Sequence, residues 1–313
     1  MNKKTNKFKA NLEFYFQKAE EFLGLHIQEN IKLLCLKLVL VFLLFFMTDD
    51  KYLIIAMPVI LIPGILFNGV ASNKYYWAFL AILTIILYLI LDFVGFYIPN
   101  HKHIYAYVCL AITFVLFFSK NTKILEGIKI QSKFIIGLCF LFATTGKFLA
   151  PEFLNGSFFV FTNTIDPRFF GFTSLMGNID FQDLLHNQNN FHDLLNTTDP
   201  DKIFQLNGAQ KLNGIALILS YWTIFIEGMI AISFISPNKF KISKYRNIFL
   251  ITFILTTYPI ATVPGFAYVL TTLGFIQSVE KEKITGYSWF YLFVFILLPL
   301  IEIPFSEVVS LLF

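Results

Sequence analysis

Four ionisable residues lie within long apolar stretches of the 313-residue sequence and are its first candidates for chemistry. They are Asp92, Lys147, Glu227 and Glu302. Charged groups are costly in an apolar environment, so those that occur there are usually functional or paired. A lysine that is shielded from water loses its proton more readily and can act as a general base. The same arrangement also fits a structural ion pair, or a lysine whose ammonium group reaches the membrane surface.

The composition predicts that these stretches are membrane spans. Hydrophobic residues make up 57% of the sequence and charged residues 14%, whereas soluble domains have roughly 45–50% and 25%. This excludes a soluble globular enzyme and a disordered chain. Because a crossing needs about 20 apolar residues, we predict an all-α polytopic bundle of eight transmembrane helices, or nine if one stretch crosses twice. The predicted spans are 31–48, 52–71, 75–98, 103–119, 132–150, 213–236, 247–278 and 287–311.

The seventh of these spans is too long for a simple crossing and should be broken. Within 247–278, the pairs Tyr258-Pro259 and Pro264-Gly265 interrupt the helical hydrogen-bond pattern. We expect two helical pieces with Tyr258 facing the protein interior. The second piece is either a re-entrant half-helix or part of a second crossing.

The distribution of lysine and arginine predicts the orientation in the membrane. The basic loops 120–133 and 237–246 fall on one side with the basic N-terminal segment 1–30, and this side is the inside. Segment 151–212 is acidic and is predicted to be one long external loop. We therefore expect an integral protein of the bacterial inner (plasma) membrane with a cytoplasmic N-terminus. Segment 1–30 is either an interfacial amphipathic helix or a cytosolic one, and 31–313 is a single transmembrane domain.

Helix geometry predicts which of the intramembrane charges can meet. With a rise of about 1.5 Å per residue, Asp92 and Lys147 lie within about 4 Å of the same depth below the outer surface. Glu227 lies about 20 Å down its span, so it is predicted to be a poor partner for Lys147. We interpret Lys147 and Asp92 as a base and its partner in an outward-opening polar cavity, or as a structural pair.

Residues 132–157, SKFIIGLCFLFATTGKFLAPEFLNGS, resemble the signature of the horizontally transferred transmembrane (HTTM) family, to which the vitamin K-dependent gamma-carboxylases belong. In that signature a span ends in a small-residue pair, a Lys, a Leu, an acidic or Pro-containing turn, an aromatic residue and a Gly. Here those roles fall to Thr145-Gly146, Lys147, Leu149, Pro151-Glu152, Phe153 and Gly156. The same span is also similar to DoxX-type four-helix proteins and to SdpB-like peptide-maturation proteins.

Three further segments are similar to the HTTM family. Asn73 opens a span as the family's Asn-His-aromatic motif does, although Lys74 stands where the His is expected. Glu227 matches an acidic residue that follows the external loop in many members. Segment 263–274, VPGFAYVLTTLG, resembles the family's Phe-Ser-Tyr segment after a broken helix, and Tyr258 stands where a further His is expected.

These observations predict a membrane enzyme of the HTTM type that acts on a lipid, a quinone or a secreted peptide from the outer face. Vitamin K-dependent carboxylation itself is not expected, because the catalytic Lys of the carboxylases falls at Phe148, one position after Lys147. The main alternative is a non-catalytic membrane subunit for export, maturation or immunity of a secreted peptide, and a transporter is a third. The candidate catalytic residues are Lys147, Asp92 and Glu227, and the candidate substrate-binding residues are Asn73, Tyr258 and Tyr268.

The remaining residue types indicate little further chemistry. The sequence has no spacing typical of metal ligands and no basic face of the kind that binds nucleic acid, and it identifies no cofactor. The three cysteines, Cys35, Cys109 and Cys139, all lie in apolar stretches. We therefore expect buried free thiols rather than disulfides.

Overall fold

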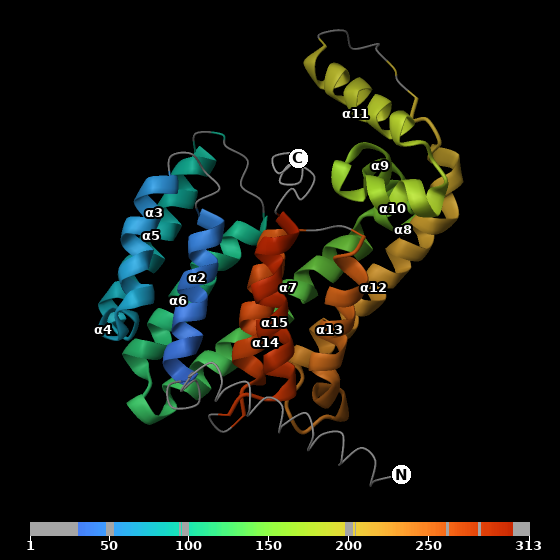
Figure 1. The fold of residues 1–313 in the computed structure, drawn as a ribbon. Coiled ribbons are helices and arrows are strands. Elements are labelled where there is room, and N and C mark those ends of the chain that lie inside the picture. The colour runs from blue at the N-terminus through green and yellow to red at the C-terminus, as the bar shows by residue number, and fades with distance from the viewer. Residues whose placement is uncertain are drawn as a thin grey trace, which may run out of the picture. The chain divides into compact units, whose positions relative to one another are not determined.

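The computed structural model describes residues 31–47, 53–93, 95, 100–197, 203, 205–260, 263–280 and 283–302 (Figure 1). The N-terminal segment 1–30 and the end of the last predicted span, beyond residue 302, lie outside the described residues. Apart from loops and one isolated β-bridge between Glu280 and Lys283, the described residues are helical. The predicted all-α fold is therefore confirmed.

The long helices follow the apolar stretches of the sequence. They are α2 (Ile31–Met47), α3 (Leu53–Leu66), α5 (Lys74–Phe93), α6 (Asn100–Phe118), α7 (Ile124–Leu149), α12 (Asn213–Ile235), α13 (Arg246–Thr257), α14 (Pro264–Ser278) and α15 (Gly286–Glu302). Shorter helices are α4 (Asn68–Ala71), η2 (Asn121–Lys123), α8 (Pro151–Leu154), α9 (Ser157–Ile165), α10 (Pro167–Gly177), α11 (Phe181–Asn196), η3 (Ala209–Leu212) and η4 (Lys241–Tyr245). The predicted external loop thus contains α8 to α11 and η3.

Two helical stretches among the described residues are long and apolar enough to cross a membrane. They are Lys74–Phe93, which is α5, and Ala209–Ile235, which joins η3 to α12. Several other apolar helices are shorter, among them Ile55–Leu66, Lys102–Phe118 and Gly286–Pro299.

The break predicted in the seventh span is confirmed. Helix α13 ends at Thr257 and α14 begins at Pro264, with a turn between them. The backbone N–H of Ile260 donates to the carbonyl of Thr257 at 3.1 Å, which closes the last turn after α13. Pro264 occupies the first position of α14, where a missing N–H removes no helical hydrogen bond.

The chain forms two compact units, and the first consists of Met1–Ile135 with Pro264–Phe313. Its core helix is α14, in which every residue except Pro264 and Phe266 is buried. This helix packs against α15, α2 and α6. Gly274 allows the close approach of α15, since a Cβ at this position would lie 2.8 Å from the ring of Tyr291.

The second unit, Ile136–Val263, is organised around α12. This helix packs against α13, α8, α9, η3 and η4, and Figure 1 shows α8, α9 and α10 beside its N-terminal half. An aromatic cluster joins these short helices to α12. It consists of Phe153, Phe159, Phe169, Ala216, Leu219 and Ile224. A smaller cluster of Phe170, Ile179, Leu184 and Leu212 attaches α10 and α11.

Candidate functional site

Lys147 and Glu227 form an ion pair in the second unit. The Nζ of Lys147, in the last turn of α7, donates to Oε2 of Glu227 on α12 at 2.5 Å. The side chain of Glu227 is 7% exposed and that of Lys147 is 22% exposed. The carboxylate of Glu227 is therefore buried, and the Lys147 side chain is mostly shielded from solvent.

A stripe on α7 brings the helix close enough to α12 and α13 for this contact. Gly137, Phe140, Thr144 and Lys147 follow one another at intervals of three or four residues, so they share one helix face. A Cβ at Gly137 would lie 2.9 Å from Cγ1 of Ile235 on α12, so any other residue here would force the two helices or their side chains to shift. The ring of Phe140 meets that of Phe253 on α13 at 5.0 Å between centroids.

The prediction that Glu227 is a poor partner for Lys147 is wrong. It assumed that the spans around them end at the same level on the outer side. In the structure α7 and α12 run antiparallel, and α12 continues about 20 Å past Glu227 to its N-terminus. Helices α8 and α9 pack beside this extension. The level of Lys147 therefore falls well inside α12.

Phe153 covers the ion pair from the side of the aromatic cluster. The Nζ of Lys147 lies 5.4 Å from the centroid of the Phe153 ring, within the range of a cation–π interaction. The ring of Phe153 in turn contacts that of Phe159 at 5.2 Å. The ammonium group of Lys147 is thus bordered by aromatic side chains, and the Phe153 ring attracts its positive charge.

Tyr258 belongs to the same unit and follows the end of α13. Its ring lies 6.4 Å from that of Phe253, which itself contacts the stripe on α7 through Phe140. The Tyr258 hydroxyl oxygen is buried, in agreement with the prediction that this side chain faces the interior. Nearby, Nε1 of Trp222 donates to Oγ1 of Thr256 at 3.2 Å and joins α12 to α13.

The other three predicted site residues belong to the first unit. Asp92 is exposed near the end of α5. The side chain of Asn73 accepts a hydrogen bond from the backbone N–H of Tyr75 at 2.9 Å and so caps the start of α5. Tyr268 is buried in α14, between the rings of Phe45 at 5.6 Å and Phe295 at 5.4 Å. The cavity shared by Asp92 and Lys147 stays a prediction.

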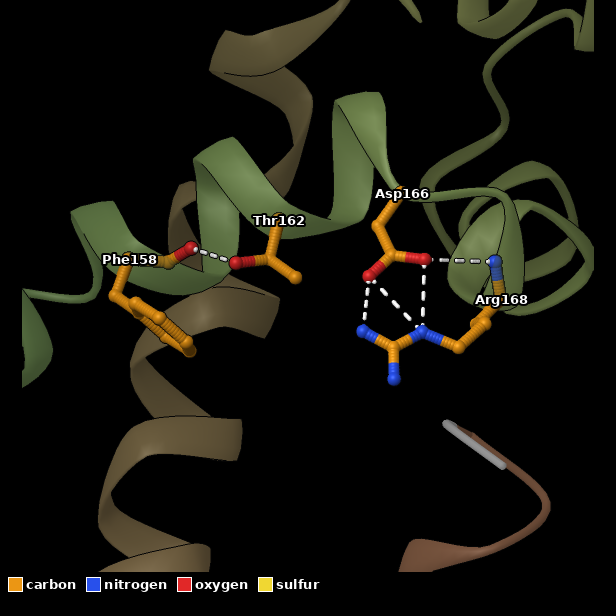
Figure 2. A network of polar contacts seen from close by, with 4 residues as sticks. All are labelled: Phe158, Thr162, Asp166 and Arg168. Carbon is orange, nitrogen blue, oxygen red and sulfur yellow. Dashed lines mark hydrogen bonds and ion pairs between the residues drawn. The ribbon is translucent and has the colours of Figure 1, made fainter. Parts of the chain in front are cut away.

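A second ion pair, which the sequence did not indicate, lies between α9 and α10 (Figure 2). Asp166 accepts hydrogen bonds from the backbone N–H of Arg168 at 3.0 Å and from its guanidinium group at 2.5–3.1 Å. Asp166 is also the N-cap of α10. Partial burial raises the pKa of Asp166, but the hydrogen bonds and charge of Arg168 outweigh it, so the pKa lies below its ordinary value.

The described residues hold no group of three or more His, Cys, Asp or Glu side chains that could bind a metal ion. Of the two histidines in α11, His186 is hydrogen-bonded to the side chain of Asn190 at 3.0 Å. Cys35 and Cys109 are buried and Cys139 is half-buried, and all three are free thiols as expected. No protein-family model, no curated protein and no solved structure matches the chain.

Proposed function

We propose that the chain is an HTTM-like integral protein of the bacterial inner membrane with eight or nine spans and a cytoplasmic N-terminus. Three observations support this. Helices occur at each predicted span, and two stretches are long and apolar enough to cross a membrane. Large apolar side chains are also exposed along α5, among them Phe79 at 50%, Ile82 at 58% and Leu89 at 65%.

Within this protein, we propose that Lys147 and Glu227 are the reactive groups of a site that modifies a lipid, a quinone or a secreted peptide at the outer face. The observation that carries the proposal is the 2.5 Å contact between Nζ and Oε2 beside the Phe153 ring. A proton can pass along this hydrogen bond from the ammonium group to the carboxylate. The neutral amine can then take a proton from a bound substrate.

In this proposal Glu227, which contacts Lys147, takes the role that the sequence analysis gave to Asp92, that of the carboxylate partner of the lysine. Asp92 is kept as a proposed member of an outward-opening polar region. Tyr258 and Tyr268 are kept as proposed substrate contacts. The amide of Asn73 already caps α5, so we propose that its contribution is to hold the start of that helix.

The test is a comparison of Lys147→Arg with the wild type and with Lys147→Met. Arginine can hold the contact to Glu227 but stays protonated, so it cannot serve as a base. We expect cells that produce the wild type to show one lipid, quinone or secreted-peptide species, detected by untargeted mass spectrometry, that is missing with both variants. A species that Lys147→Arg produces as well as the wild type does would contradict the role of Lys147 as a base.

The alternative is a non-catalytic subunit that helps to export, mature or protect against a secreted peptide. It is favoured by Phe148, Lys74 and Tyr258, which stand where the family resemblance expects a catalytic Lys and two His residues. In this case Lys147 and Glu227 only hold α7 against α12. A peptide-precursor gene beside the gene for this chain, and full function of Lys147→Arg, would then be expected.

A further inference from the structure

The segment Asn73–Trp77, which resembles the Asn-His-aromatic motif, fixes the start of α5 to the helices before it. The hydroxyl of Tyr76 donates to the backbone carbonyl of Ile60 in α3 at 3.0 Å. Nε1 of the buried Trp77 donates to the backbone carbonyl of Ala71 in α4 at 2.7 Å. The motif therefore holds α3, α4 and α5 together at one end of the first unit.

Lys74 and Tyr75, two other members of this segment, contact the end of α6. Nζ of Lys74 lies 4.7 Å from the centroid of the Phe117 ring and 5.2 Å from that of the Tyr75 ring, within the range of cation–π interactions. The two rings meet edge to face at 5.6 Å. Lys74 is half-buried and Tyr75 is exposed. The positive charge of Lys74 is therefore held near the surface by rings from both α5 and α6.

Two further lysines follow directly after α6. Lys120 precedes η2 and Lys123 ends it, and the backbone N–H of Lys123 donates to the carbonyl of Lys120 at 2.8 Å. Both side chains are exposed. The first acidic residue after α6 is Glu126, which pairs with Lys129 at 2.8 Å. This end of the first unit therefore carries an excess of positive charge.

The exposed side chains of α5 show where this charge lies along the helix. Large side chains that are 49–90% exposed recur at intervals of three or four residues and form one stripe. They are Tyr75, Phe79, Ile82, Ile86, Leu89 and Phe93. By helical rise the stripe is about 27 Å long, close to the thickness of about 30 Å of a hydrocarbon core. Lys74 stands directly before its first residue and Asp92 directly before its last, so the two charges mark its ends.

We propose that this end of the first unit binds the headgroups of anionic phospholipids in the cytoplasmic leaflet. The surface, named here the lysine patch, consists of Lys74, Lys120, Lys123, Phe67, Tyr75 and Phe118. The inference rests on the proposed membrane location and on the orientation that places 120–133 inside. Figure 1 shows α4, which follows Phe67, at the same end of α5 as the first turns of α7, which follow Lys123.

Charge and exposed aromatic area together select this occupant. The cytoplasmic leaflet has a negative surface potential, which attracts lysines that lie close to it. Phe67, Tyr75 and Phe118 are 61%, 67% and 80% exposed, and aromatic rings are typical of the level of the lipid headgroups. A soluble anion would leave these rings in water. An anionic phospholipid pairs with the ammonium groups and covers the rings at the same time.

Local enrichment of a lipid can be measured by fluorescence quenching of the full-length protein in vesicles. A single cysteine replaces Phe118 in the lysine patch or Phe93 at the opposite end of the stripe, and each is labelled with a fluorophore. The vesicles mix phosphatidylcholine and phosphatidylglycerol, and one of the two carries a doxyl group near the top of its acyl chain. Wild type, whose cysteines are buried or half-buried, gives the background. We expect doxyl-phosphatidylglycerol to quench Phe118→Cys about fivefold more than doxyl-phosphatidylcholine, and both to quench Phe93→Cys equally.

Variants of the lysines test which groups carry this preference. Lys74→Arg keeps the charge and the contact with Phe117, so it should keep the preference, whereas Lys74→Met keeps only the chain and should reduce it. The side chains of Lys120 and Lys123 are exposed, so Lys120→Gln with Lys123→Gln should reduce the preference without lowering the unfolding midpoint. All three changes together should leave the two lipids equal.

The outcomes separate this inference from the proposed membrane location. Equal quenching of Phe118→Cys by the two lipids would overturn the binding of anionic lipid, leave the membrane location standing and point to an acidic protein segment as the occupant. No quenching at either cysteine would overturn the membrane location as well. A preference that survives Lys120→Gln with Lys123→Gln, and falls with Lys74→Met only together with the unfolding midpoint, would make Lys74 a packing residue and overturn the lysine patch.

Discussion

The Lys147–Glu227 and Asp166–Arg168 ion pairs share a nitrogen–oxygen distance of 2.5 Å, but both partners of the second pair are more exposed than those of the first. The Glu227 side chain is 7% exposed, whereas that of Arg168 is 51% exposed. Water can compete for the half-exposed guanidinium group of Arg168, but it has little access to the carboxylate of Glu227. The comparison shows that the exposure of the two side chains, rather than the distance between them, decides how much an ion pair contributes to the stability of the fold.

The largest expected effect is the removal of one partner of the buried pair. Glu227→Ala should lower the free energy of unfolding by about 3–5 kcal/mol, because the Lys147 ammonium group loses its counter-charge in an apolar setting. Chemical denaturation in mixed micelles measures this. The double variant Lys147→Met with Glu227→Leu is the control and should recover most of the loss. If the double variant is as unstable as Glu227→Ala, the loss of stability comes from altered side-chain packing rather than from the unpaired charge.

The buried pair also depends on the close approach of α7 to α12, which gives the next largest effect. Gly137→Ala should destabilise the protein by about 1–3 kcal/mol through overpacking, because its Cβ would meet Ile235 at 2.9 Å. Gly146→Ala is the matched control on the same helix, since nothing lies within 4 Å of a Cβ there. Thermal unfolding of both in one detergent is the measurement. Equal midpoints for the two variants would contradict the tight contact.

For the exposed pair the expected effect is smaller. Asp166→Ala removes the N-cap of α10 and its contact with Arg168, and about 1 kcal/mol should be lost, most of it from the cap. Asp166→Asn keeps a capping oxygen and should cost less. The same denaturation assay distinguishes the two. If Asp166→Ala lowers the free energy of unfolding as much as Glu227→Ala does, the two ion pairs do not differ in their contribution to stability.

The smallest expected effect is the pH dependence that comes from Asp166. Its pKa is lowered in the folded protein, so its stabilisation is complete above the ordinary Asp pKa of about 3.9. It is lost as the pH falls through the lower folded pKa. Unfolding midpoints of wild type and Asp166→Asn should therefore converge as the pH falls below about 4. If the unfolding midpoints of the two variants instead keep a constant difference below about pH 4, Arg168 does not stabilise the ionised carboxylate of Asp166 in the folded state.

The sequence allowed the helix positions and the break after Thr257 to be predicted, because apolar runs and prolines act locally. It also identified Lys147 and Glu227 as unusual charges. It did not allow them to be paired, since pairing depends on how far α12 extends past the end of α7. No sequence pattern indicated the ion pair between Asp166 and Arg168.

The two units also differ in how they can form during synthesis. The second unit is one continuous piece of chain, Ile136–Val263, so all of its contacts are available as soon as α13 has emerged. The first unit contains α2 to α6 but takes its core helix, α14, from the C-terminal piece. The faces of its early helices that pack against α14 therefore stay uncovered until α14 has been synthesised, which is after the second unit. The core of the first unit can therefore form only after the whole of the second unit has been synthesised.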